Sequence, residues 1–418
     1  MVKLSRPKCK VAIIGAGPAG LACAEVLAER SDFDINIYEQ KPSAARKFLM
    51  AGKTGLNISH NEPLGDFIDR YDHAEWLRPM VEAFHAEHIQ AWMQDLGIES
   101  YIGSSGRIFP NEMKAAPLLR AWLKRLQNQG VKFHYRHQVR HIQDGEITVI
   151  DLQNSDLKND QTRTEQVDAI VLACGAVSWS QLGSDGRWQS WLDDAQIEPF
   201  QASNVGVCVA WSDFMQAHFG QPLKRIRAWA EGDAPQFGEM VISHYGLEGG
   251  LVYRCNRALR GHFSTEDDRS KTAKLYLDLL PAFSQSEILD KLQHGKKLSL
   301  NTLWQRIGLD KTKIALIRDV VAKSDWNDHV KMAQYIKQLA INVQCFRSIE
   351  EAISCAGGIK QDALDENLKL KNSRAIYACG EMLDWDAPTG GYLLTACMVS
   401  GRWVGEHLDH NFANLNSC

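Results

Sequence analysis

A glycine-rich turn near the start of the chain constrains the fold more than any other feature. The turn Gly15-Ala-Gly-Pro-Ala-Gly20 follows a short β-branched run, Val11 to Ile14, and precedes a segment typical of a helix, Leu21 to Glu29. A second expected strand, 35–38, ends at Glu39. A strand, a G-x-G-x-x-G turn, a helix and a strand that ends in an acid form the dinucleotide-binding fingerprint of a Rossmann-type α/β domain.

Each residue type in this fingerprint has a physical task. The first glycine allows the tight turn, the second lets the backbone approach a pyrophosphate, and the third lets the helix pack on the strand. Proline suits the first helical turn, and the helix N-terminus offers unpaired N–H groups to phosphates. The acid can accept hydrogen bonds from ribose hydroxyls. The predicted cofactor contacts here are Gly15, Gly17, Pro18, Ala19, Gly20 and Glu39.

The segment after Glu39 favours FAD over a nicotinamide cofactor. It is basic and then glycine-rich, as suits an extended pyrophosphate and ribitol that must be covered. Lys41 could instead meet the 2′-phosphate of NADP, although the Glu39 carboxylate would repel that phosphate. We therefore predict bound FAD, with further contacts from Gln40, Lys47, Gly52 and Asn57.

A second glycine-rich turn lies near the end of the chain. An expected strand, 375–379, runs into Gly380-Glu-Met-Leu-Asp-Trp-Asp-Ala-Pro-Thr-Gly-Gly-Tyr392, and a helix is expected over 393–407. The start of that helix could face the pyrimidine end of a flavin, where its dipole would favour the reduced, anionic ring. An earlier expected strand, 167–172, ends in Ala-Cys-Gly-Ala over 173–176, where we expect the backbone to approach the cofactor at a third point. The predicted contacts are Ala173, Gly175, Gly380, Glu381, Asp384, Gly390, Gly391 and Tyr392.

Composition excludes several classes of protein. The 418 residues are 44% hydrophobic and 23% charged with a net charge of −4, so no excess of basic residues points to nucleic acid. No apolar run reaches the roughly 18 residues of a spanning helix, and the N-terminus lacks a signal-peptide core, which predicts a cytoplasmic protein without a membrane partner. The ten cysteines contain no C-x-x-C pair, which argues against a structural metal site or a disulfide framework. The sequence carries no signal for an oligomeric state.

The expected pattern of secondary structure changes after residue 194. Short strand-like stretches up to 282 suggest a β-rich insert, and 283–340 reads as amphipathic helices. We expect a return strand of the insert in 341–356. The FAD-binding domain would then comprise 1–194 and 357–418, interrupted by this insert, with the polar segment 153–166 as a loop or hairpin tip.

A resemblance supports this arrangement. The N-terminal fingerprint, Gly106-Arg-Ile-Phe-Pro110 with Lys114, Gly357-Gly358 and the turn 380–392 resemble the bacterial FAD-dependent oxidoreductase family typified by YhiN and BaiN. The resemblance spans nearly the whole chain. It implies a Rossmann FAD domain interrupted by a barrel-like β domain that carries a helical insertion. Many relatives have Thr-His-x-Gly-x-Ser-Gly-Pro in the insert, whereas this chain has Ser-His-Tyr-Gly-Leu-Glu-Gly-Gly over 243–250.

Catalytic candidates lie in the insert. His244 can exchange a proton near neutral pH, which would partner hydride transfer, although a structural role in a turn is the alternative. Tyr245 and the arginines at 254 and 257 are the other candidates, with Arg254 preferred. There is no second G-x-G-x-x-G, so the sequence shows no separate domain for a nicotinamide cofactor. Either NAD(P)H approaches the flavin transiently as the electron donor, or another donor reduces the flavin. Two functions stay open: an oxidoreductase that reduces or forms a C=C bond of a small organic substrate, or a flavin-binding redox sensor or RNA-modification-associated protein.

Overall fold

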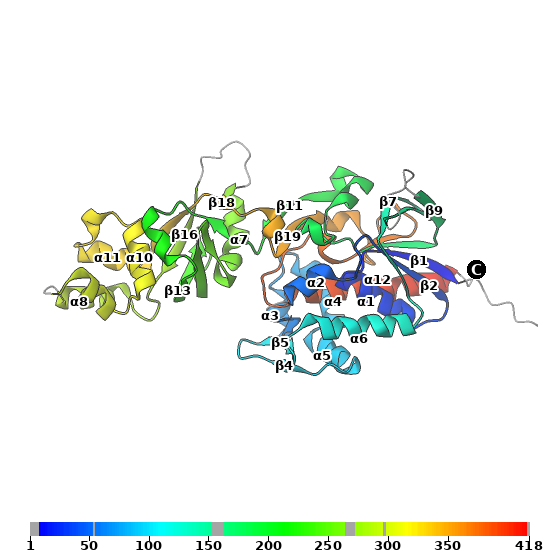
Figure 1. Ribbon diagram of the computed structural model, residues 1–418, viewed down its shortest axis with the longest axis horizontal. Helices are drawn as coiled ribbons and strands as arrows, with labels where there is room; N and C mark the ends of the chain where they lie inside the picture. Colours follow the sequence, from blue (N-terminus) through cyan, green and yellow to red (C-terminus); the bar gives the residue numbers. More distant parts are fainter. Residues whose placement is uncertain (1–7, 53–54, 153–161, 264–271, 296–297, 416–418) are drawn as a thin grey trace, which may run out of the picture. The chain divides into compact units, whose positions relative to one another are not determined.

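The computed structural model describes residues 8–52, 55–152, 162–263, 272–295 and 298–415, with the side chains of 409–415 not included. The chain divides into two compact units (Figure 1). The terminal unit contains residues 1–201 and 354–418, and the inserted unit contains 202–353. The boundaries between the two units therefore lie between residues 201 and 202 and between residues 353 and 354. The sequence had suggested boundaries after residues 194 and 356.

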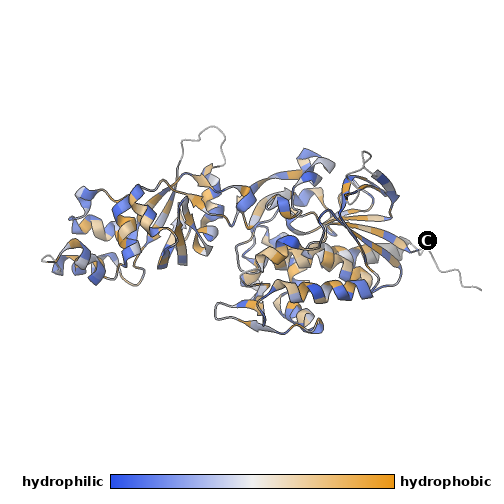
Figure 2. Ribbon diagram, viewed as in Figure 1, coloured by the Kyte–Doolittle hydropathy of each residue, from blue (hydrophilic) through white to orange (hydrophobic). Residues whose placement is uncertain are grey.

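A five-stranded parallel sheet forms the centre of the terminal unit. Its order is β20-β10-β1-β2-β6, so the last strand of the chain lies at one edge and the first lies in the middle. The central strands are β-branched runs buried on both faces, and Figure 2 colours them largely orange. The bounds are β1 (Cys9–Ile14), β2 (Phe33–Glu39), β6 (Lys132–Tyr135), β10 (Ala169–Leu172) and β20 (Ile376–Ala378).

Two helices from opposite ends of the chain pack against each other on one face of this sheet. They are α1 (Pro18–Ala28) and α12 (Tyr392–Leu415). Gly401 permits their close approach, because a Cβ there would lie 2.1 Å from the carbonyl oxygen of Ala19. One turn later, a Cβ on Gly405 would lie 3.0 Å from the carbonyl oxygen of Cys23. The two glycines form a flat stripe on α12 that receives the backbone of α1.

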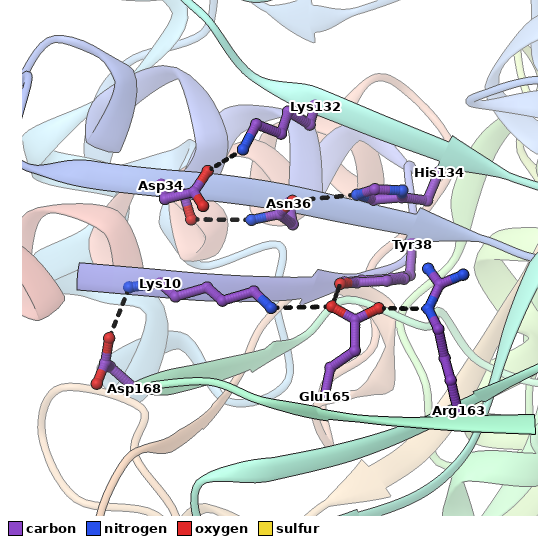
Figure 3. A network of polar contacts seen from close by, with 9 residues as sticks. All are labelled: Lys10, Asp34, Asn36, Tyr38, Lys132, His134, Arg163, Glu165 and Asp168. Carbon is purple, nitrogen blue, oxygen red and sulfur yellow. Dashed lines mark hydrogen bonds and ion pairs between the residues drawn. The ribbon is translucent and has the colours of Figure 1, made fainter. Parts of the chain in front are cut away.

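The other face of the parallel sheet is covered by an antiparallel sheet of β7 (His137–Gln143), β8 (Glu146–Asp151) and β9 (Thr162–Gln166). Figure 3 shows how Glu165 on β9 fastens the two layers. Its carboxylate accepts hydrogen bonds from Lys10 at 2.9 Å and Tyr38 at 2.9 Å. The expectation of a loop over 153–166 is thus wrong for 162–166, which pair with β8. Residues 153–161 lie outside the described part.

The rest of the terminal unit surrounds these layers. The helices are α2 (Arg46–Ala51), α3 (Leu64–Ile68), α4 (Ala74–Ala83), α5 (Ala86–Asp95) and α6 (Ala115–Asn128). A small antiparallel sheet contains β3 (Ser59–His60), β4 (Ser100–Ile102) and β5 (Arg107–Pro110). Strands β11 (Ile197–Ser203) and β19 (Ser354–Ile359) pair with each other. Short 3-10 helices include η1 (Ser180–Leu182), η2 (Arg187–Trp191), η3 (Asp194–Gln196), η6 (Ile349–Glu351, in the inserted unit), η7 (Gln361–Ala363) and η8 (Gly380–Met382).

The inserted unit contains a seven-stranded sheet of order β17-β16-β13-β14-β15-β12-β18 with antiparallel neighbours. Its strands are β12 (Val207–Cys208), β13 (Pro222–Ala230), β14 (Gln236–Ser243), β15 (Gly246–Glu248), β16 (Ala273–Asp278), β17 (Leu339–Val343) and β18 (Cys345–Phe346). The helices are α7 (Gly250–Phe263), α8 (Gln285–His294), α9 (Leu300–Arg306), α10 (Lys311–Val320) and α11 (His329–Lys337), with the 3-10 helices η4 (Asp213–His218) and η5 (Lys323–Asp325).

The amphipathic helices expected within 283–340 are confirmed as α8, α9, α10 and α11, and they share one hydrophobic core with the sheet. Helix α7 was not anticipated in the β-rich stretch. Its buried side chains, among them Leu251, Cys255 and Leu259, recur at helical spacing and pack into the same core. In the described residues, no helix is both long enough and apolar enough to cross a membrane.

Candidate dinucleotide-binding site

A hollow in the terminal unit lies where the central parallel strands end. It encloses about 990 Å³ of empty space, including the part that opens to solvent. Ile14, Glu39, Ala173 and Cys379 line it, and these residues end or directly follow β1, β2, β10 and β20. The carboxyl edge of a parallel sheet is where open α/β folds bind nucleotides.

The glycine turn forms one wall of the hollow, as the fingerprint predicts. Gly15 has a φ of +110°, and a Cβ there would lie 2.3 Å from the carbonyl oxygen of Ala173. Gly17 also lines the hollow and caps α1, but a Cβ on Gly17 would meet nothing within 4 Å. Pro18 and Ala19 follow in the first helical turn. The wall therefore leaves open space in front of the unpaired N–H groups of α1, which suits a pyrophosphate.

Glu39 is held in place by backbone groups. The amides of Ala16 and Lys41 donate to its two carboxylate oxygens at 3.1 and 2.8 Å. Burial nevertheless raises the pKa of Glu39, while these hydrogen bonds oppose the shift. A fixed carboxylate at the end of β2 can accept hydrogen bonds from ribose hydroxyls.

Opposite the glycine turn, a lysine–glutamate pair joins distant parts of the chain. The Lys47 ammonium lies 2.6 Å from the Glu381 carboxylate and donates to the hydroxyl of Ser178 at 2.8 Å. Glu381 also accepts a hydrogen bond from the backbone amide of Cys355 at 3.3 Å. Arg46 lies next to Lys47 on the rim of the hollow, so positive charge faces the place where phosphates would lie.

Sequence reasoning missed the segment 182–191, which covers another side of the hollow. Gln40 holds it by donating to the carbonyl of Gly183 at 2.8 Å, and Trp188 donates to the carbonyl of Gly175 at 2.8 Å. Both Trp188 and Trp191 line the hollow. Five of the twelve tryptophans lie between 179 and 229, and this clustering was the available signal for an aromatic wall.

The structure does not bring all the predicted contacts to the hollow. Gly20 supports helix packing, since its Cβ would lie 2.2 Å from the carbonyl oxygen of Gly15. Gly52 supports the packing of α2 on α6, because a Cβ there would lie 2.4 Å from that of Ala115. Asp384 lines a different surface hollow with His73 and Trp403, and burial raises its pKa.

The start of α12 lies one to two turns from the hollow. Cys397 on α12 lines the hollow, and Gly391 precedes it by six residues, or about 9 Å of helix. Gly391 has a φ of +97°, and a Cβ there would lie 2.5 Å from the Cα of Ser59. Gly390 is likewise at positive φ beside the ring of Tyr392, whose hydroxyl donates to Glu62 at 2.5 Å. Gly391 therefore packs against β3, and Gly390 packs against the ring of Tyr392.

Cysteines near the hollow are unsuited to thiolate chemistry. Cys174, Cys379 and Cys397 line it, and burial raises the pKa of each thiol far above its usual range. They act as small apolar residues.

The catalytic candidates lie in the inserted unit. His244 is exposed in the turn between β14 and β15, and Tyr245 donates a short hydrogen bond to Glu248. The guanidinium of Arg347 covers the Tyr245 ring at 4.5 Å from its centroid. Arg254 on α7 donates to the carbonyl of Phe237 at 2.9 Å.

The residues at the hollow fit FAD. Open space lies in front of the amides of α1, a fixed acid stands at the ribose position, and two cations line the rim. In the described part of the chain, the Ser184 hydroxyl, the Arg46 Nε and the amide oxygen of Asn57 are buried without a hydrogen-bond partner. Ser184 and Arg46 belong to the lining, so the site offers unpaired polar atoms to a bound nucleotide.

Comparison with known proteins agrees with this geometry. Residues 9–407 match the family model described as the HI0933-like protein Rossmann domain. A 3-dehydro-bile acid delta(4,6)-reductase of Clostridium scindens is 24% identical over 418 residues, which covers 95% of this chain and 98% of the relative. A ribosomal RNA dihydrouridine synthase of Haemophilus influenzae is 23% identical over 396 residues, or 91% and 93% of the two chains.

Among solved structures, the open conformation of a flavocytochrome c3 fumarate reductase aligns with a TM-score of 0.51 at 13% identity. The alignment covers 96% of this chain and 78% of that one, and it shows a shared fold. The family match extends from β1 into α12 and includes every strand that borders the hollow. The chain therefore belongs to the HI0933-like Rossmann family, and it is an FAD-dependent oxidoreductase.

Proposed function

We propose that the chain reduces a carbon–carbon double bond of a small organic substrate, with NAD(P)H as the electron donor. One observation carries this proposal: two curated relatives, the bile acid reductase and the dihydrouridine synthase, each align with more than nine-tenths of this chain, and their names describe the addition of hydrogen across double bonds. The hollow supplies what such a reaction needs on the cofactor side. Bound FAD would supply the capacity to accept a hydride from one partner and pass it to another.

The chain's own residues would hold the cofactor in a defined orientation. Glu39 would accept hydrogen bonds from the ribose hydroxyls, and the N-terminal amides of α1 would bind the pyrophosphate. Lys47 adds charge near the phosphates while Glu381 fixes its ammonium. Trp188 closes the side of the hollow and limits the access of water.

The proton that accompanies hydride addition is assigned to His244. Its imidazole is exposed at the tip of the β14–β15 turn, and an imidazole can both donate and accept a proton. Tyr245 is a positioning residue, because Glu248 and Arg347 fix its ring beside the histidine. Arg254 keeps a packing role, since its guanidinium ties α7 to β14.

The test is anaerobic reduction of the FAD-loaded protein by NADH and NADPH, followed by mixing with a panel of α,β-unsaturated ketones. Reoxidation of the flavin by a member of the panel, with formation of the saturated product, supports the proposal. His244→Gln should slow that step at least about tenfold without loss of FAD, because general acids typically contribute 10²–10⁴-fold. Reduction without reoxidation by any unsaturated compound would favour the redox-sensing alternative.

An RNA base is the second candidate substrate, favoured by the similarity to the ribosomal RNA dihydrouridine synthase. The net charge of −4 gives no electrostatic support for RNA binding. Adding uridine-containing ribosomal RNA to the same assay distinguishes the candidates, because only one substrate class should reoxidise the flavin.

A cytoplasmic location is part of this proposal, in keeping with the absence of disulfides among the described cysteines.

A further inference from the structure

Two cysteines that are far apart in the sequence meet at the edge of the sheet in the inserted unit. Cys208 ends β12 and Cys345 begins β18, and the two are direct partners in the antiparallel register. Backbone hydrogen bonds fix this register on both sides. Gln344 donates to the carbonyl of Cys208, and Arg347 to that of Gly206, each at 2.9 Å. Strand β18 is the edge of the seven-stranded sheet, so reagents can approach the pair from solvent.

The geometry of the pair suits a covalent bond. Directly opposed residues of antiparallel strands have Cα atoms about 4.5–5.5 Å apart, within the 4.4–6.8 Å range of disulfides. Their side chains stand on the same face of the sheet. The Cys208 thiol reaches β18, where it donates to the carbonyl of Phe346 at 4.0 Å, and it is close enough to Cys345 to raise the pKa of that thiol.

Among the described cysteines, Cys345 is the exposed one. Cys208 is half-buried, as are Cys9 and Cys174, whereas the others are buried, namely Cys23, Cys255, Cys355, Cys379 and Cys397. Partial burial and the neighbouring thiol raise the pKa of Cys345 to about 11, while Arg347 opposes the shift. The first attack on an external disulfide is therefore slow at neutral pH, because only the thiolate reacts. The second step is intramolecular, because Cys208 and Cys345 are paired on neighbouring strands of the same sheet.

We propose that Cys208 and Cys345 form a reversible cross-strand disulfide by exchange with a low-molecular-weight disulfide, RSSR. The thiolate of Cys345 attacks one sulfur of RSSR, which breaks its S–S bond and releases one RS⁻. The thiolate of Cys208 then attacks the sulfur of Cys345 and releases the second RS⁻. The two protein thiols lose two electrons and two protons, and RSSR gains them as two RSH molecules.

Closure of this bond would rigidify the neighbourhood of the β14–β15 turn. The amide of Val209, next to Cys208, donates to the carbonyl of Tyr245 at 2.9 Å. Arg347, two residues after Cys345, covers the Tyr245 ring. The modification thus lies one or two residues from contacts that hold this turn.

The experiment uses the full-length, FAD-loaded protein incubated with oxidised glutathione at pH 8, then alkylated under denaturing conditions and mapped by mass spectrometry. The expected product is a peptide pair linked through Cys208 and Cys345, with two fewer alkylated thiols, restored by dithiothreitol. Cys9→Ser should still form the link, since Cys9 lies in β1. Cys345→Ser should leave Cys208 without a protein disulfide.

Thermal unfolding provides a second readout. The oxidised protein should unfold at a temperature several degrees higher, because the cross-link closes a long loop in the unfolded chain. Cys345→Ser treated in the same way should show no shift. Recovery of both cysteines as free thiols, or of a stable mixed disulfide with glutathione on Cys345, would overturn the proposal.

Discussion

The ammonium of Lys47 lies 2.6 Å from the carboxylate of Glu381, which ties α2 to the turn before α12 at the rim of the cofactor hollow. Glu381 is 7% exposed and Lys47 24%. Removal of one member of such a pair leaves the other charge without compensation, a loss of about 3–5 kcal/mol in buried cases. Replacement of both charged residues causes a much smaller loss of stability.

The first prediction follows from this pair. Lys47→Met should lower the free energy of unfolding by about 2–4 kcal/mol and weaken FAD binding, because Glu381 is left unpaired. The double variant Lys47→Met with Glu381→Gln should recover most of the stability but not the FAD affinity. Urea unfolding and flavin titration measure the two effects separately. Equal stability of the single and double variants would show that the pair contributes little.

The second prediction concerns Gly17. Gly17→Ala should leave the fold intact, because the new methyl group meets no protein atom within 4 Å. The methyl group enters the hollow instead, so FAD binding should weaken by about 1–3 kcal/mol, or roughly 5- to 150-fold in Kd. Gly65→Ala is the matched control, since a Cβ there is also uncrowded but lies in α3. If the two variants bind FAD equally well, Gly17 does not face the cofactor.

The third prediction concerns pH and Glu165. Hydrogen bonds from Lys10, Arg163 and Tyr38 lower the pKa of this carboxyl from 4.5 to about 2, against the opposing effect of burial. A lowered pKa in the folded state stabilises the protein above pH 4.5, and this contribution disappears as the pH falls from 4.5 to about 2. Because Arg163 is partly exposed, the contribution at pH 7 is about 2–3 kcal/mol.

Glu165→Gln should therefore reduce stability at pH 7 by about that amount, and the difference from the natural protein should shrink in acid. Denaturant unfolding at pH 7, 4 and 3 measures this trend. Glu87→Gln, on the exposed surface of α5, is the matched control for the loss of one carboxylate. A stability difference that stays constant with pH would contradict the assignment.

The fourth prediction concerns Gly391. Gly391→Ala should lower stability by about 2–4 kcal/mol, because the residue has a φ of +97° and its Cβ would collide with Ser59. If the start of α12 also faces the flavin, displacement of its amides should lower the two-electron potential by about 10–40 mV. Redox titration of variant protein that is fully loaded with FAD measures this. A destabilised variant with an unchanged potential would assign the glycine to packing alone.

The sequence predicts those parts of the fold that depend on local patterns. The fingerprint 11–39 specifies a strand, a turn and a helix through residue types that only such geometry requires, and the structure confirms them. The amphipathic helices of 283–340 are confirmed for the same reason. Helix α7 was missed because its apolar residues alternate with arginines in a stretch rich in strand signals.

Features that arise from long-range pairing could not be predicted. Asp384 and Glu381 were both expected at the cofactor, yet the two residues line different hollows. Likewise, Gln40 contacts Gly183 only because the segment 182–191 folds back over β2. No local spacing encodes either arrangement.

The stripe of Gly401 and Gly405 on α12 has a consequence for synthesis of the chain on the ribosome. Helix α1 is made first, but the surface that covers it and the edge strand β20 are made last. The apolar face of α1 therefore stays exposed to solvent while more than three hundred further residues are translated. The inserted unit is complete by residue 353 and contains its own core, so it can fold earlier. Truncation before Gly401 would therefore leave a chain whose folded insert is joined to an unfinished nucleotide-binding domain.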